Sequence, residues 1–257
     1  MAEGGGLLNR CRTKSSTGGS NPPLSATYSS VDTGLLPSVM VLRFGWVKSV
    51  SDGARLPTTT DAWERFLNPD VLRPNLVIAS LYIAAFEVLK SSVVDRVKTF
   101  FSSPHGPGGF TPDPEYQTEV MSRNKSPQYA SLDWLRENAA IDDNDIAAYE
   151  RVKQCRNELA HQIPSLLMNG FRADMPERFA EMIALVDKIE RWWILNVEIP
   201  INPDFDGVEI DEAGIASGPV MALRPLTDIA LGPDDKARFY FDKFVKQNRP
   251  APPTENT

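Results

Sequence analysis

The feature that most constrains this fold is the stretch NLVIASLYIAAFEVLKSSVVDRVKTFF, which directly follows Pro74. Proline is favoured in the first turn of a helix, so the segment reads as one long helix that ends near Phe101. Its apolar side chains cover most of the circumference, and its polar residues fall on one narrow line at helical spacing: Glu87, Ser91, Asp95 and Lys98. Such a helix belongs at the centre of a bundle or at a dimer interface.

Composition narrows the class of protein. Of the 257 residues, 42% are hydrophobic and 24% are charged, which is typical of a soluble globular chain. No apolar run reaches the roughly 20 residues of a transmembrane helix, and the first residues lack the apolar core of a signal peptide. With only two cysteines and two histidines, neither a disulfide framework nor a metal site is expected. We therefore predict a cytoplasmic protein with no membrane partner, no metal and no cofactor.

The order of helix and loop signals predicts a mainly α protein whose centre is a helical bundle. We expect a disordered tail over 1–30, an irregular arm over 31–60 and the helical domain over 61–198. In that domain Asp61 is the expected first N-cap, with Glu64 at capping-box spacing, and 102–127 is a Pro- and Gly-rich loop. Residues 199–248 are predicted to form an extension with short strands and a final helix, followed by a disordered tail over 249–257.

The informative chemistry lies on the predicted helix 146–163. Its apolar stripe consists of Tyr149, Val152, Cys155, Leu159 and Ile163, at spacings of three and four. At about 100° per residue Arg156 falls inside this stripe, while Asn157 and His161 lie one turn apart at its edge. A guanidinium on a buried face is costly unless something compensates it, because it cannot lose its proton.

Pro164 predicts that the helix ends directly after this group of residues. His161 would then lie in the last turn, where the negative end of the helix dipole favours the protonated imidazole. RNA can be cut without a metal by a base at the ribose 2′-hydroxyl, a cation at the phosphate and an acid at the leaving 5′-oxygen. His161 fits the base or the acid, Arg156 fits the cation, and Asn157 could orient the ring or bind the phosphate. Two copies across a two-fold axis would complete the set.

The run Arg156-Asn157-Glu158-Leu159-Ala160-His161 resembles the Arg-x4-6-His motif of the HEPN superfamily. This resemblance implies a compact helical bundle over 61–198, frequently a homodimer. It also implies a metal-independent endoribonuclease of toxin–antitoxin or anti-phage defence systems, with RNA as substrate and an antitoxin or regulatory protein as a partner. The catalytic pair would be Arg156 and His161, and Asn157 the accessory polar residue. Many members carry a further charged cluster on the first long helix, for which Glu87, Lys90 and Arg96 are candidates.

Structural explanations stand beside these functional ones. Arg156 could form an ion pair with Glu87 or Glu190, and His161 could bind last-turn carbonyls. The net charge of −7 repels phosphate, so any RNA contact needs a local pocket or a basic strip. Two other functions therefore stay open: a non-catalytic binding or scaffold protein, and a nucleotide-binding regulatory partner of a nucleotidyltransferase.

Several remaining residues have simpler interpretations. His105 is expected in a solvated loop, and Trp192 and Trp193 are expected to pack between helices. The acidic run Asp142, Asp143 and Asp145 occurs where a helix N-terminus favours acids, so capping explains it better than metal binding does. The acids of the C-terminal extension are expected to be solvated, with a weaker possibility of a divalent-ion site: Asp204, Asp206, Glu209, Asp211 and Glu212.

Overall fold

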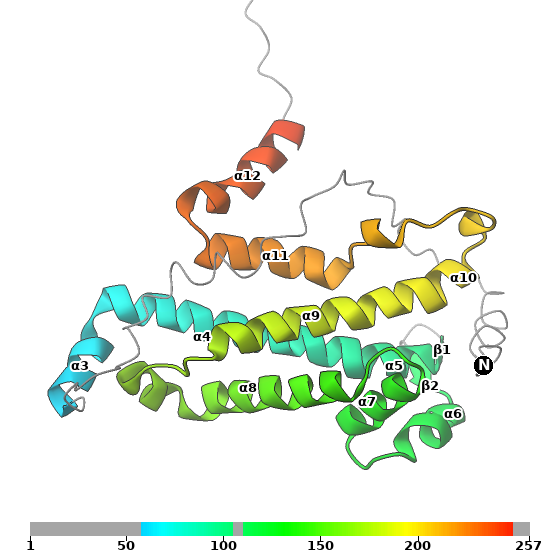
Figure 1. Ribbon diagram of the computed structural model, residues 1–257, viewed down its shortest axis with the longest axis horizontal. Coiled ribbons are helices and arrows are strands. Elements are labelled where there is room, and N and C mark those ends of the chain that lie inside the picture. The colour runs from blue at the N-terminus through cyan, green and yellow to red at the C-terminus, as the bar shows by residue number, and fades with distance from the viewer. Residues whose placement is uncertain (1–57, 105–109, 249–257) are drawn as a thin grey trace, which may run out of the picture. The chain divides into compact units, whose positions relative to one another are not determined.

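A computed structural model of the chain describes residues 58–104 and 110–248 (Figure 1). In this part of the chain helices dominate, and the only strands are β1 (Ser102–Pro104) and β2 (Phe110–Pro112). The prediction of a mainly α protein is confirmed. The predicted tails over 1–30 and 249–257, most of the predicted arm, and His105 lie outside the described residues.

The described residues divide into two compact units, each of which gathers segments that are distant in sequence. Unit 1 contains Glu87–Arg151, apart from 105–109, and Glu181–Val220. Unit 2 contains 58–86, Val152–Ala180 and 221–248. Four helices continue from one unit into the other, so each of them supplies core residues to both.

The long apolar helix is present, as α4 (Pro69–Lys90), the π-helical turn η1 (Ser91–Asp95) and α5 (Arg96–Phe100). The expected core residues Leu81, Leu89, Val93 and Val97 are buried, and the polar line is exposed at Glu87, Ser91, Asp95 and Lys98. By length and composition Pro69–Phe100 could cross a membrane, yet 44% of its most apolar window is buried inside the protein. A core helix of a soluble protein has the same properties.

The first described helix, α3 (Thr59–Leu67), begins earlier than the sequence predicted. Its N-cap is Thr58 rather than Asp61. The Thr58 hydroxyl accepts a hydrogen bond from the Asp61 backbone, and the Asp61 carboxylate accepts one from the Thr58 backbone. The capping box is therefore real, but it is shifted by three residues, because Asp61 acts as its N3 acid and not as its cap.

The predicted loop 102–127 is partly wrong. β1 and β2 pair antiparallel, and the chain then forms α6 (Pro114–Tyr116) and the π-helical turn η3 (Gln117–Met121). Tyr116 and Val120 are one helical turn apart and both are buried, so a core contact favours helix here. The sequence did not predict this helix, because its prolines indicated a loop. Pro114 is compatible with a helix because it occupies the first turn, where a proline costs no hydrogen bond.

The next helices are α7 (Pro127–Glu137), α8 (Asp143–Asn169), which contains the predicted helix 146–163, and α9 (Met175–Trp193). The prediction that this helix ends before Pro164 is wrong, because α8 continues beyond Pro164 and bends there. Gln162 has non-helical dihedrals (φ −125°, ψ 18°), so that two helical segments meet at a kink. Pro164 removes the hydrogen bond to the Ala160 carbonyl and displaces the preceding backbone, which accounts for a bend at this point.

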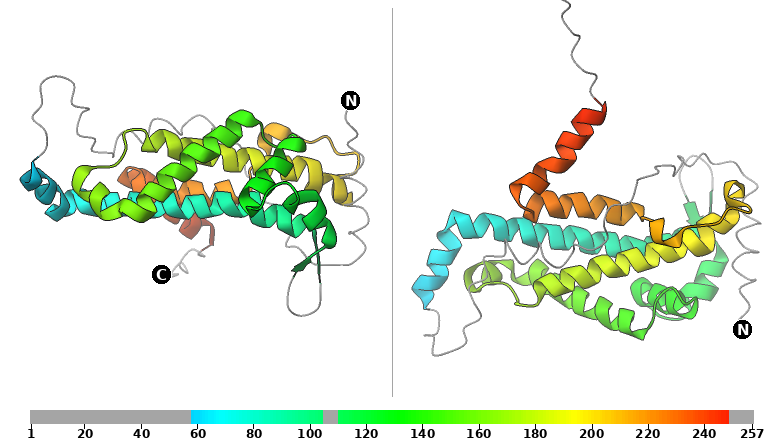
Figure 2. Two further views of the ribbon diagram at one scale, coloured as in Figure 1. Left: turned by 90° about the horizontal axis from the view of Figure 1, so that it is seen from below. Right: turned by 45° about the horizontal axis from the view of Figure 1, so that its top comes forward.

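The prediction of short strands within 199–248 is wrong. After the π-helical turn η4 (Ile194–Glu198) come α10 (Ile199–Ile201), two short 3-10 turns, η5 (Pro203–Phe205) and η6 (Glu212–Gly214), and then α11 (Gly218–Leu231). Leu223 and Leu231 are buried at helical spacing, and this burial outweighs the presence of Pro225 inside α11. The predicted final helix is confirmed as α12 (Asp234–Asn248), and Figure 2 shows the turn between α11 and α12.

A buried carboxylate in unit 1 pairs with a partly exposed arginine beside a cluster of aromatic rings. Arg96 lies 3.1 Å from the Glu190 carboxylate, which is only 3% exposed, and it also pairs with Glu198. Its guanidinium is 5.6 Å from the Trp193 ring, which stacks on Trp134 at a centroid distance of 5.9 Å. The expected packing of Trp193 is confirmed, and the buried carboxylate depends on Arg96 for its counter-charge.

Replacing Arg96 by Met is expected to lower the free energy of unfolding by about 3 kcal/mol, because the Glu190 carboxylate would stay buried without its cation. Urea denaturation at neutral pH measures this change. Lys90→Met is the control: Lys90 pairs with Glu87 at the surface, with both side chains more than 40% exposed, and should lose less than about 1 kcal/mol. Equal losses in the two variants would contradict a buried ion pair.

Candidate functional site

The candidate site lies on the part of α8 that belongs to unit 2. The stripe residues Val152, Cys155 and Leu159 are buried there, as predicted. The Tyr82 hydroxyl of α4 donates a hydrogen bond to the Val152 carbonyl over 3.2 Å, and the Tyr82 ring contacts Phe179 of α9. These contacts fix the rotation of α8 and therefore the directions of the side chains beside the stripe.

Arg156 is half-buried and is held by two neighbours in unit 2. Its guanidinium carbon lies 5.2 Å from the centroid of the buried Phe86 ring, a cation–π distance. One guanidinium nitrogen donates a hydrogen bond to the Asn157 side-chain oxygen over 3.3 Å. Of the two carboxylates expected as ion-pair partners, Glu190 pairs with Arg96 instead. Part of the compensation for burying Arg156 is therefore an aromatic face.

His161 is exposed and is the last residue before the kink at Gln162. On a regular helix it lies about 140° and 7.5 Å along the axis from Arg156, with Asn157 about 40° from it. Arg156 and His161 therefore point to different sides of α8, and Asn157 lies between them. In one copy of this helix, the Arg156 guanidinium and the His161 imidazole are therefore not directed at the same small ligand.

The three supporting residues proposed from the long helix have partners of their own. Lys90 pairs with Glu87 over 3.1 Å, and Arg96 belongs to the Glu190 and Glu198 cluster. All three are in unit 1, whereas Arg156, Asn157 and His161 are in unit 2.

A second arginine beside the motif helix was not anticipated from the sequence. Arg172 reaches Glu158 of α8 over 3.0 Å and binds the Asp174 carboxylate with two nitrogens, at 2.9 and 3.1 Å; Asp174 also pairs with Arg178. The Arg172 hydrogen bonds lower the pKa of Asp174, and they raise the pKa of Arg172 further. Asp174 and Arg172 are two residues apart in the loop before α9, and a pairing at this separation is not displayed by any helical pattern.

The acidic runs are not ligand sets in the described residues. The Asp142 carboxylate accepts hydrogen bonds from the backbones of Asn144 and Asp145, which confirms the capping interpretation, and Lys188 pairs with both Asp142 and Asp145. No group of three or more His, Cys, Asp or Glu side chains within 58–104 and 110–248 could hold a metal ion.

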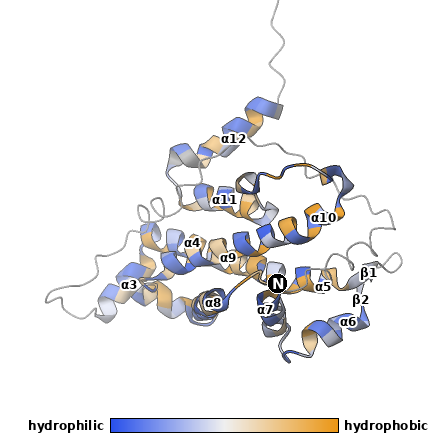
Figure 3. Ribbon diagram, turned by 45° about the vertical axis from the view of Figure 1, so that its right-hand side comes forward, coloured by the Kyte–Doolittle hydropathy of each residue, from blue (hydrophilic) through white to orange (hydrophobic). Residues whose placement is uncertain are grey.

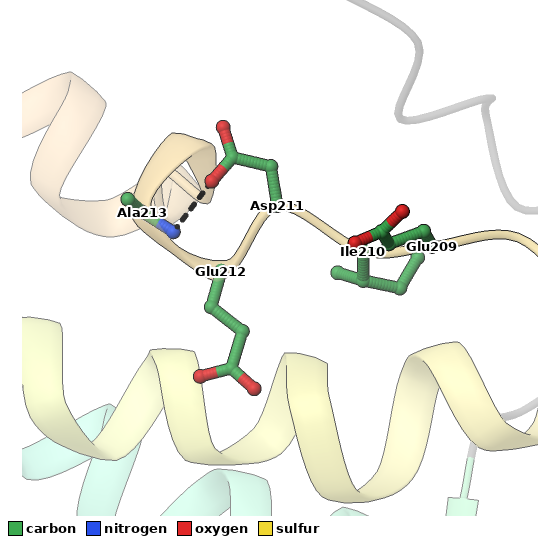
Figure 4. Close-up of a pocket in the computed structure, with 5 residues that line it drawn as sticks. All are labelled: Glu209, Ile210, Asp211, Glu212 and Ala213. Carbon is green, nitrogen blue, oxygen red and sulfur yellow. Dashed lines mark hydrogen bonds between the residues drawn. The ribbon is translucent and has the colours of Figure 1, made fainter.

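A hollow at the C-terminal loop is lined by Glu209, Ile210, Asp211, Glu212 and Ala213 (Figure 4). The Asp211 carboxylate accepts a hydrogen bond from the Ala213 backbone over 3.1 Å, and the Glu212 carboxylate points to the opposite side of the loop. Because the acids diverge, this hollow does not form a cation site.

Comparison with known proteins adds no assignment: no protein-family model, no curated protein and no solved structure matches this chain. The chemistry of the site must therefore be argued from its own geometry.

The ion network at Asp174 is expected to make stability depend on pH in the acid range. Because the folded-state pKa of Asp174 lies below the ordinary value of 3.8, its stabilising effect is complete above about pH 4 and is lost as the pH falls through the folded value. Wild type should therefore be more stable than Asp174→Asn at neutral pH. The difference should shrink towards pH 2–3, as measured by urea denaturation.

Asp204→Asn, on the exposed C-terminal loop, is the control and should show a much smaller pH-dependent difference. A gap between wild type and Asp174→Asn that stayed constant from neutral pH to pH 2–3 would contradict this ion pairing.

Proposed function

We propose that this protein is a metal-independent endoribonuclease of the HEPN type, acting in the cytoplasm as a homodimeric toxin or anti-phage effector. The observation that supports this most is the arrangement at the α8 kink. An exposed imidazole ends one helical segment, and a guanidinium fixed by Phe86 and Asn157 lies one and a half turns before it. The motif thus combines an accessible proton-transfer group with a positioned cation.

Each residue has a defined role in the proposed reaction. His161 takes the proton of the ribose 2′-hydroxyl, whose oxygen attacks phosphorus while the bond to the 5′-oxygen breaks. Arg156 stabilises the charge that builds on the phosphate oxygens, since its planar fork matches them. A second His161 protonates the leaving 5′-oxygen, which leaves a 2′,3′-cyclic phosphate and a 5′-hydroxyl.

The proposal requires two copies of the chain. Arg156 and His161 diverge by about 140° on one helix, whereas a two-fold axis beside α8 would place the imidazole of one copy opposite the arginine of the other. A composite site of this kind also concentrates positive charge locally, which a chain with a net charge of −7 needs in order to hold RNA. An antitoxin or regulatory protein would act by covering this surface.

A second function, a non-catalytic helical binding protein, is favoured by the contact between Arg156 and Phe86. A half-buried guanidinium over a buried ring contributes to packing whether or not any substrate binds. In that case the motif would stabilise α8 and nothing more.

Substitution of the motif separates the two functions. Under the ribonuclease proposal, His161→Ala and Arg156→Lys each reduce cleavage of a structured RNA in EDTA by at least about 100-fold. His161→Ala should leave the melting temperature within about 2 °C of wild type, because the side chain is exposed. The fragments are analysed for 2′,3′-cyclic phosphate ends, and sedimentation should give twice the chain mass of 28.5 kDa.

Two variants on the same helix are matched controls: Arg151→Lys, in an exposed pair with Glu181, and Gln154→Ala. Both should cleave at the wild-type rate. Wild-type protein that leaves RNA intact, together with a motif variant that only lowers the melting temperature, would favour the binding protein. If the active enzyme had the mass of a monomer, only the two-copy site would be contradicted, and the ribonuclease proposal would remain.

A further inference from the structure

The last helix, α12, exposes an unusual number of aromatic side chains. Phe239, Phe241 and Phe244 are 55%, 58% and 66% exposed. Figure 3 shows apolar residues interleaved with polar ones along this helix. Scattered apolar residues are normal on a protein surface, but three phenylalanines within six positions form a concentration that usually marks an interaction site.

The neighbouring helix α11 adds aliphatic residues to this surface. Leu223 and Leu231 bury one side of α11, whereas Met221, Leu226 and Ile229 are 44–52% exposed on the other. α11 and α12 belong to the same unit from residue 221 onwards, and the Tyr240 hydroxyl donates a hydrogen bond to the Asp228 carboxylate over 2.5 Å. The exposed apolar residues of these two helices together are called the α11–α12 surface: Met221, Leu226, Ile229, Phe239, Phe241 and Phe244.

The charge around these aromatic residues is opposite to that of the whole chain. The helix α12 contains four basic residues and three acidic residues, a net charge of +1, so the rest of the chain carries −7 − 1 = −8. Arg238 and Lys246 are exposed, and the Lys243 ammonium lies 5.7 Å from the Phe239 ring centroid. Long basic side chains beside exposed aromatic rings are typical of helices that lie in the headgroup region of a membrane.

We propose that the α11–α12 surface binds the surface of an anionic lipid bilayer. The expectation of no membrane partner rested on the absence of a spanning segment, and a peripheral contact needs none. The 15 residues of α12 would measure about 22 Å, too short to cross the roughly 30 Å of hydrocarbon. The phenylalanines enter the headgroup boundary, and the basic residues meet lipid phosphates.

Two of the phenylalanines lie on one side of α12. Phe244 lies about 60° from Phe241 on a regular helix, whereas Phe239 points about 160° away from Phe241. A helix in the headgroup region buries mainly one face, so Phe241 and Phe244 enter the headgroup boundary more deeply than Phe239, which lies on the other side beside Lys243. Single-stranded RNA is favoured less, because Met221, Leu226 and Ile229 offer no ring on which a base can stack.

The test is co-sedimentation of the full chain with phosphatidylcholine vesicles prepared with and without phosphatidylglycerol. The protein should pellet with the anionic vesicles only, and raising the salt from about 0.1 to 0.5 M should release it. The double variant Phe241→Ser/Phe244→Ser should bind at least about tenfold more weakly, since two buried rings are lost. Arg238→Gln/Lys246→Gln should lose the preference for anionic vesicles.

Leu67→Ser is the matched control, because Leu67 of α3 is 68% exposed in the same unit and does not belong to the α11–α12 surface. It should bind as wild type does, and so should His161→Ala, because the vesicle contact does not depend on the proposed ribonuclease. Equal pelleting of wild type and the double-Phe variant would overturn the proposal. Two further results would also overturn it, each together with wild-type protein that does not pellet with vesicles. In one, the double-Phe variant loses only the dimeric mass; in the other, it loses only the retention of RNA in a gel shift.

Discussion

The burial of one long apolar helix determines much of this structure. The helix from Pro69 to Phe100 is apolar around most of its circumference, and 44% of its most apolar window is buried inside the protein. Its first part, as far as Phe86, contributes to unit 2, and the part from Glu87 contributes to unit 1. In unit 2 the Tyr82 hydroxyl and the Phe86 ring contact α8 and set its rotation, and in unit 1 Arg96 supplies the counter-charge of Glu190. The motif residues are therefore positioned by the core and not by a loop.

The sequence was informative where burial follows helical spacing and less so where other interactions decide. The stripe of α8, the polar line of the long helix and the final helix were predictable, because a period of 3.6 residues directly reports the buried side. The short strands predicted for 199–248 are absent, because leucines of this segment are buried as a helix even though prolines and glycines occur along it. Pro164 was expected to end α8 and instead bends it, since a proline removes one hydrogen bond without preventing the next turn.

The candidate site shows the same division. Position on the helix could be predicted for Arg156, Asn157 and His161, because i and i+4 relations are fixed by the helix. Their partners could not. The Phe86 ring under Arg156 and the Arg172 contact to Glu158 depend on how helices and loops pack, which a single sequence does not encode locally. The Phe86 ring, which lies beneath the Arg156 guanidinium at 5.2 Å, could not be identified from the spacing of polar and apolar residues on α8.

The two π-helical turns that flank the buried ion pair have a consequence for how this chain tolerates insertions. η1 ends immediately before Arg96, and η4 ends at Glu198. A π turn closes its hydrogen bond over five residues instead of four, so every residue after it is rotated by about 100° relative to an uninterrupted α-helix. Deleting a single residue from Ser91–Asp95 would therefore convert the π turn into a regular α-helical turn and leave Arg96 facing both carboxylates. Each π turn thus accommodates one additional residue without changing the direction of the charged residue that follows it or ends it.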